Sequence, residues 1–126
     1  MGRRSIRQMV TEEDIRHFAL SLPESAEEPY NRLPSFRVRG TLFLRIHELP
    51  DAFFVRCAGL EERNGLLQAE PGKFFITPHY SGYPAVLVRL SRVDLDEMTE
   101  LVTESWRLSA PKRLLAAYDA EHPPAP

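Results

Sequence analysis

Five arginines that alternate with apolar residues could give this chain a surface for phosphate groups. They are Arg37, Arg39, Arg45, Arg56 and Arg89. Arginine hydrogen-bonds phosphate oxygens and base edges, and aromatic rings beside it stack on bases. Because side chains alternate between the faces of a strand, Phe43 is predicted to share a face with Arg45, and Phe54 with Arg56. The pattern predicts a nucleic-acid-binding face of a sheet, with an ordinary solvated face as the alternative.

An aromatic, proline-containing segment at residues 77–84 is the second candidate site. Its His79 is a candidate ligand-binding residue, and Tyr80 and Tyr83 could line a small pocket. The alternative is that the two tyrosines cover an edge of the sheet while His79 is exposed, because most aromatic side chains pack against their neighbours. The segment indicates a site for a small ligand or for another protein.

Catalytic and metal-binding patterns are missing from the sequence. It contains no GxSxG elbow, no Walker loop, no HExxH pair and no paired cysteines at zinc spacing. The histidines are scattered, so no oriented base is predicted beside Ser81 or Cys57. We therefore expect a binding protein rather than an enzyme, with no cofactor and no metal.

Length and composition indicate one packed domain. A chain of 126 residues fits a single domain, and its 43% hydrophobic and 27% charged residues are close to the globular average. The formal charge of −2 means that any nucleic-acid surface must be a local patch. The single cysteine, Cys57, cannot form an internal disulfide, which favours a cytoplasmic location, and no apolar run approaches the ~20 residues that span a bilayer.

Both ends of the chain are predicted to be disordered. Residues 1–10 form a basic leader, and acidic residues follow at the place where an export signal would need a hydrophobic stretch. Met9 is an alternative start to Met1. The folded domain is expected over residues 11–120, followed by a tail at 121–126.

The elements that must position the candidate residues follow from the hydrophobic period. Thr11 caps a helix that Pro23 ends, and residues 24–31 form an acidic loop. Strands are predicted at 35–39, 41–46, 52–58, 73–76 and 85–90, with the last near the centre of the sheet and a short helix at 59–68. Helices follow at 94–110 and from Pro111. This order predicts an α+β fold: a mainly antiparallel sheet of about five strands, with N-terminal and C-terminal helices packed on one face.

The helix at 94–110 has one apolar stripe, which predicts how it docks. Asp94 is its cap. The stripe consists of Leu95, Met98, Leu101, Val102, Ser105, Trp106 and Leu108. Trp106 is therefore expected in the interface between this helix and the sheet. On the third strand, Phe53, Val55 and Cys57 are predicted to face the core, with Phe54 and Arg56 on the other face.

Three segments resemble the MmcQ/YjbR family of small bacterial proteins. They are Leu33-Pro34-Ser35-Phe36-Arg37-Val38 with Gly40 and Phe43, the turn Pro71-Gly72-Lys73-Phe74, and Ser105-Trp106-Arg107-Leu108. Many members have a tryptophan at the fifth strand, after a His-containing loop, where this chain has Tyr83-Pro84-Ala85-Val86. The resemblance implies a CyaY-like α+β fold with paired β-ribbon wings and a DNA-binding role.

The CyaY-like fold also raises the question of iron binding by an acidic helix face. The candidate ligands are Asp94, Asp96, Glu97, Glu100 and Glu104. Such a run is more often a solvated face whose first residues cap the helix, and we interpret it so.

Two functions remain open on the sequence. One is weak, largely non-specific DNA binding through the arginines. The other is binding of another protein or a small ligand by the segment at 77–84. One exposed, continuous arginine face would favour DNA, whereas pairing of the arginines with Glu48, Asp51 or Glu61 would count against it.

Overall fold

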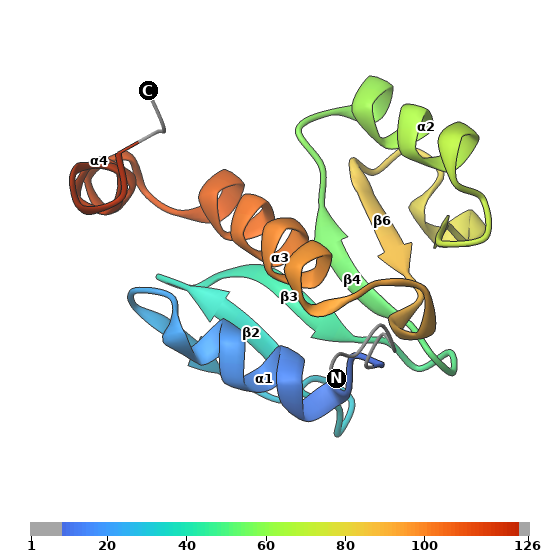
Figure 1. Cartoon of the computed structure of the whole chain (residues 1–126), viewed down its shortest axis with the longest axis horizontal. Helices are drawn as coiled ribbons and strands as arrows, with labels where there is room; N and C mark the ends of the chain where they lie inside the picture. The colour runs from blue at the N-terminus through green and yellow to red at the C-terminus, as the bar shows by residue number, and fades with distance from the viewer. Residues whose placement is uncertain (1–8, 124–126) are drawn as a thin grey trace, which may run out of the picture.

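The computed structural model describes residues 9–123, which form one α+β domain (Figure 1). The predicted leader and tail fall largely on residues 1–8 and 124–126, which lie outside the described part. The helices are α1 (Glu12–Ser21), α2 (Leu60–Ala69), α3 (Leu95–Ser109) and α4 (Lys112–Glu121), and the short 3-10 helices are η1 (Pro78–Tyr80) and η2 (Leu90–Arg92). The strands are β1 (Ser25–Glu27), β2 (Ser35–Val38), β3 (Thr41–Ile46), β4 (Phe53–Arg56), β5 (Phe74–Phe75) and β6 (Ala85–Val88). No helix within residues 9–123 is long and apolar enough to cross a membrane.

The strands form one antiparallel sheet in the order β1-β2-β3-β4-β6-β5, which confirms the predicted fold class. Two details of the predicted strand arrangement are wrong. The acidic segment predicted as a loop contains β1. Its residues Ser25–Glu27 pair with β2, and Ser25 lies opposite Val38. β6 is buried on both faces as predicted, yet it lies next to the edge strand β5 rather than at the centre.

Helices α1 and α3 lie side by side across one face of the sheet, as predicted (Figure 1). Trp106 is completely buried on α3, where its ring packs against Tyr118 and its Nε1 donates to the Pro23 carbonyl over 3.1 Å. Two residues of the predicted stripe, Leu95 and Leu108, are instead 41% and 39% exposed, because they lie near the ends of the helix, where fewer neighbours are available.

β4 alternates as predicted. Phe53 and Val55 belong to the main core under the helices, and Phe54 packs in a separate cluster on the other face. Cys57 follows the strand in the main core, and burial raises the pKa of its thiol to about 11. The thiol is therefore protonated and unreactive at neutral pH.

A β-bulge at Phe43 reverses the alternation of β3. Phe36 of β2 pairs with Leu44, but the next residue, Arg37, pairs with Leu42, so Phe43 is the extra residue. Phe43 and Leu44 are consequently both buried in the main core, and Leu42 turns to the opposite face. The prediction that Phe43 shares a face with Arg45 is wrong for this reason.

Two side chains hydrogen-bond backbone groups next to the bulge. Ser105 Oγ on α3 donates to the Phe43 carbonyl over 2.6 Å and accepts from the backbone N–H of Arg56 over 2.8 Å. The side chain of Arg56 donates through Nε to the Leu42 carbonyl over 3.1 Å. Ser105 is fully buried, so no water replaces it.

We expect Trp106→Ala to lower the free energy of unfolding by ~3–5 kcal/mol, because it leaves a cavity and removes the hydrogen bond to Pro23. Leu95→Ala on the same helix is the matched control and should change stability by less than ~0.5 kcal/mol, since Leu95 is exposed. Urea denaturation of both variants measures the difference. Equal losses would contradict the packing described above.

We expect Ser105→Ala to cost ~1–3 kcal/mol for each backbone group that it leaves buried and unpaired. Ser109→Ala, one turn further along α3, removes only a hydrogen bond to a carbonyl of its own helix and should be nearly neutral. Native-state hydrogen exchange at the Arg56 amide reports the effect directly. An unchanged exchange rate there would mean that Ser105 does not support the bulge.

Candidate functional site

The face of the sheet opposite α1 and α3 carries a row of side chains that the strand register aligns. Arg45 on β3 is opposite Phe54 on β4, which is opposite Leu87 on β6, which is opposite Phe75 on β5. Directly opposed residues share a face. Phe54 and Leu87 are buried, so something besides α1 and α3 must cover this outer face.

The cover is the aromatic segment at 77–84. Tyr80 is 6% exposed, and its ring centroid lies 5.8 Å from that of Phe54. Tyr83 stacks on the same ring at 6.3 Å with an interplanar angle of 23° and keeps 39% of its surface exposed. The tyrosines therefore lie on the outer face rather than along the sheet edge, and His79 is exposed beside Tyr80.

Arg63 on α2 holds this segment in place, and sequence reasoning missed it. Arg63 is 5% exposed, and its guanidinium donates to the carbonyls of Tyr80 at 2.6 Å, Tyr83 at 2.9 Å and Ser81 at 3.1 Å. A signal was present: Arg63 precedes the apolar Leu66 by three residues, so both lie on one side of the helix.

A tight turn builds the opposite wall. Tyr30 and Leu33 exchange two backbone hydrogen bonds of 2.9 Å, with Asn31 and Arg32 at φ values of 51° and 66°. Such left-handed pairs are typical of two-residue hairpin turns. The turn places the Tyr30 ring 4.9 Å from the guanidinium of Arg45.

Arg45 is held from three sides. Besides Tyr30, its guanidinium donates to the Tyr80 hydroxyl at 3.3 Å and to Glu48 at 3.2 Å. The Asn31 side chain hydrogen-bonds the same carboxylate and, with a backbone hydrogen bond and Arg45, lowers the pKa of Glu48 to about 2. Burial and the neighbouring Arg45 lower the pKa of His47. At neutral pH the negative charge of Glu48 therefore balances Arg45, and His47 adds no charge.

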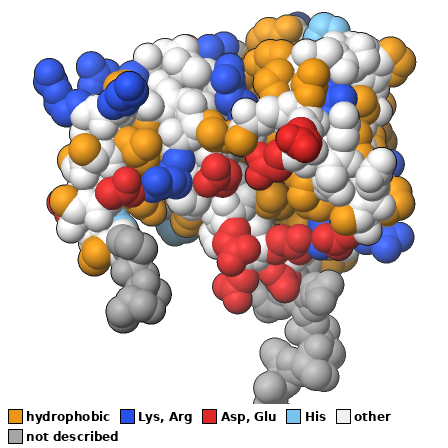
Figure 2. Space-filling model, turned by 90° about the horizontal axis from the view of Figure 1, so that it is seen from above, with side chains coloured by type: hydrophobic (Ala, Val, Ile, Leu, Met, Phe, Trp, Pro, Cys, Tyr) orange, Lys and Arg blue, Asp and Glu red, His pale blue; other side chains and the backbone are white. Residues whose placement is uncertain are grey.

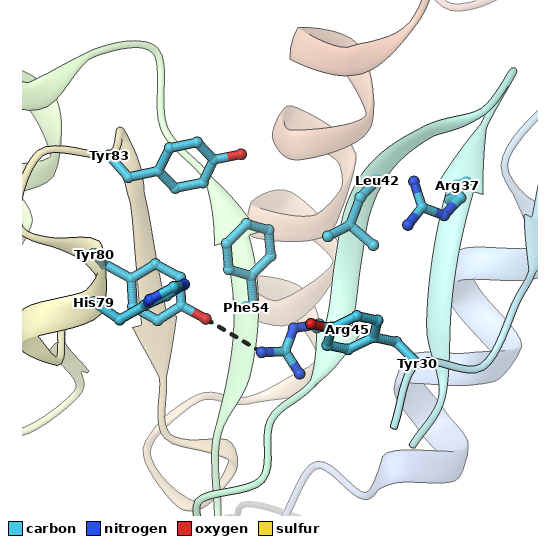
Figure 3. Close-up of a pocket in the computed structure, with 8 residues that line it drawn as sticks. All are labelled: Tyr30, Arg37, Leu42, Arg45, Phe54, His79, Tyr80 and Tyr83. Carbon is cyan, nitrogen blue, oxygen red and sulfur yellow. Dashed lines mark hydrogen bonds between the residues drawn. The ribbon is translucent and has the colours of Figure 1, made fainter. Parts of the chain in front are cut away.

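These walls enclose a cavity of about 360 Å³ between the aromatic segment and the Tyr30 turn (Figure 3). Five predicted site residues line it: Arg37, Arg45, His79, Tyr80 and Tyr83. Phe54, predicted as a ring on this face, lines it as well. Sequence reasoning gave no role to Tyr30 and Leu42, the other two lining residues. The structure thus brings members of the two candidate sets into one cleft.

The remaining arginines lie elsewhere or are engaged. Arg39 and Arg89 were predicted on strands, but β2 ends at Val38 and β6 at Val88. Arg39 occupies the turn before Gly40, where φ is 50°, and pairs with Glu24 at 3.0 Å, while Arg89 lies 4.2 Å over the ring of Phe75. Arg56, besides supporting the bulge, donates to the Tyr83 hydroxyl at 3.2 Å.

Carboxylates accompany the arginines closely enough to break up a basic face. Arg37, Arg39 and Arg45 pair with Glu28, Glu24 and Glu48 at 3.7, 3.0 and 3.2 Å. In the view of Figure 2, acidic side chains gather across the middle and lower part, and basic ones gather at the upper left, with further basic groups scattered over the rest of this face.

The acidic residues of α3 have local roles. Asp94 caps the helix by accepting from the backbone N–H of Glu97, as predicted, and the Glu97 carboxylate pairs with Lys73 at 2.6 Å. Within residues 9–123, no three side chains of histidine, cysteine, aspartate or glutamate gather as metal ligands would.

We expect Arg63→Met to speed hydrogen exchange of the amides in residues 77–84 by more than tenfold, because it removes the donor shared by three carbonyls at nearly constant volume. Arg113→Met, at an exposed position of α4, is the control and should leave these amides unchanged. Exchange measured by mass spectrometry separates the two. If residues 77–84 stay protected, the segment is held by its aromatic packing alone.

Comparison with known proteins places this arrangement in a family. Uncharacterized protein Mb2600 of Mycobacterium bovis and Uncharacterized protein Rv2570 of Mycobacterium tuberculosis are each 44% identical to this chain over 68 residues. The matched region is 54% of this chain and 53% of theirs, so the chain spans about half the length of these curated relatives.

The fold itself has a solved counterpart in protein DR2400 of Deinococcus radiodurans, which contains a domain designated DUF419. The two structures superpose with a TM-score of 0.71 over 92% of this chain and 91% of the other. At 23% identity, this likeness concerns the fold alone. Residues 20–108, from the end of α1 to the end of α3, match the sequence profile of the YjbR family. The profile thus spans the sheet, the bulge and the cleft, and the chain belongs to the YjbR family.

Proposed function

We propose that the protein is a non-catalytic binding module for a small molecule that combines a flat apolar part with a negatively charged group, and that the cleft is its site. One observation carries the proposal: arginines from two strands and aromatic residues from a distant loop line the same cavity of about 360 Å³. Small-molecule sites usually measure ~300–1,000 Å³ and combine mostly apolar walls with a few polar groups.

The aromatic side of the cleft suits a flat group. Phe54 is buried, and Tyr83 stacks on it at an interplanar angle of 23° and is 39% exposed. Offset-stacked rings attract one another beyond the area that they bury. Leu42 adds an apolar contact between this side and the arginines (Figure 3).

The other side of the cleft suits an acid. Arg37 and Arg45 reach it from adjacent strands. A guanidinium group binds carboxylate or phosphate through two parallel hydrogen bonds. Together the two sides favour a ligand that carries ring and acid in one molecule.

Weak, largely non-specific DNA binding is the second candidate. The observation in its favour is that Arg45 and Arg56 lie beside the rings of Tyr30 and Tyr83, since single strands bind through stacked rings and cations. Against it, a phosphate must compete with the carboxylates that already pair with Arg37, Arg39 and Arg45.

We expect nuclear magnetic resonance titration with aromatic acids at low salt to shift signals of Tyr80, Tyr83 and Phe54. Leu42→Trp places a large ring in the cleft and should abolish these shifts. Leu95→Trp adds the same ring at an exposed position of α3 and should leave them intact. Shifts that map outside the cleft, or that persist in Leu42→Trp, would contradict the proposal.

The same protein titrated with single-stranded and duplex DNA over a range of salt concentrations tests the second candidate. Each phosphate that is neutralised contributes ~0.9 to the slope of log K against log salt. A slope of about −3 or steeper, with DNA competing for the cleft, would favour DNA as the ligand.

A further inference from the structure

The two arginines of the cleft differ in how firmly their carboxylate partners hold them. The Arg45 side chain is 11% exposed, and its partner Glu48 is fixed by Asn31 and remains ionised far into the acid range. The Arg37 side chain is 32% exposed, and its Nε lies 3.7 Å from Glu28, whose side chain is 61% exposed. An exposed pair at this distance is weak, so an incoming acid can replace Glu28 more easily than Glu48.

Arg37 is also oriented for this exchange. Its Nη1 donates to the Gly40 carbonyl at 3.1 Å, which fixes the guanidinium from one end. Figure 3 shows the group at the rim of the cleft, with Leu42 and Phe54 between it and Tyr83. A ring that stacks against Tyr83 and Phe54 can therefore direct an attached acid toward Arg37.

The charge of the cleft selects the kind of acid. Arg37 and Arg45 are balanced by Glu28 and Glu48, and His47, whose pKa is lowered, adds no charge at neutral pH. His79, the other titratable group of the wall, is exposed. Replacing Glu28 by one negative charge leaves the charge on these two ion pairs unchanged, whereas a doubly charged phosphate adds a further negative charge. Phosphate sites commonly use helix N-termini and several converging donors.

We infer that the cleft recognises a planar aromatic monocarboxylate, with the carboxylate on Arg37 in place of Glu28 and the ring against Tyr83 and Phe54. This inference rests on the proposed function of the cleft. It assigns to Arg37 the discrimination of charge and to Glu28 the role of an internal competitor that lowers affinity.

The experiment measures the affinities of 2-naphthoate, its neutral analogue 2-naphthamide and a nucleoside monophosphate at pH 7 and low salt. Wild type should bind naphthoate at least tenfold more tightly than naphthamide. Arg37→Gln should remove that preference, because it weakens naphthoate binding at least tenfold and naphthamide binding much less. Glu28→Gln should strengthen naphthoate binding several-fold.

Matched controls come from the neighbouring ion pair. Arg39 pairs with Glu24 and does not line the cleft, so Arg39→Gln and Glu24→Gln should leave the affinity for naphthoate unchanged. Equal loss in Arg37→Gln and Arg39→Gln would indicate a general charge effect and overturn the inference.

The outcomes separate this inference from the function on which it rests. If naphthoate and naphthamide bind in the cleft with equal affinity, the role of Arg37 is overturned and small-molecule binding still stands. Tighter binding of the monophosphate would overturn the monocarboxylate. Failure of all three probes to bind would overturn both proposals.

Discussion

The bulge at Phe43 is the constraint on which the rest of the structure depends. An extra residue in β3 moves Phe43 into the core and turns Leu42 to the outer face, so the same strand contributes to both layers. A bulge disrupts the ladder locally, and Ser105 from α3 and the side chain of Arg56 hydrogen-bond backbone groups next to it. The same bulge therefore contacts α3 on one face of the sheet and places Leu42 on the other face.

The cleft exists because the outer face is covered only in part. The segment at 77–84 shields Phe54 and Leu87 and is fixed by Arg63 from behind. On the other side, the turn at Tyr30, just before β2, reaches Arg45. These two covers leave a gap between them, and the bulge turns Leu42 toward that gap.

Much of the fold follows from the sequence because period and capping are local signals. Thr11 and Asp94 cap the helices that they were predicted to cap, and β4 alternates without interruption. The bulge cannot be predicted from the hydrophobic pattern, because the strand stays apolar with or without an extra residue. The extra residue nevertheless moves every side chain beyond it to the other face of the sheet. β1 escapes because a three-residue edge strand of Ser25, Ala26 and Glu27 has no apolar alternation to detect. The site was predicted in two halves, since only the tertiary structure joins residues 37–45 to residues 79–83.

The arginines show why a window without acidic residues in sequence does not make a basic surface. Residues 33–46 contain no carboxylate. However, β1 lies in the acidic stretch that precedes β2, and its antiparallel pairing with β2 brings that stretch beside the arginines. Glu24 and Glu28 thereby reach Arg39 and Arg37, and Glu48, just after β3, reaches Arg45. Each partner lies outside the window, and strand pairing brings it close. Because local charge is nearly balanced, long-range attraction contributes little, and selectivity must come from contacts within the cleft, where ring and guanidinium act at short range.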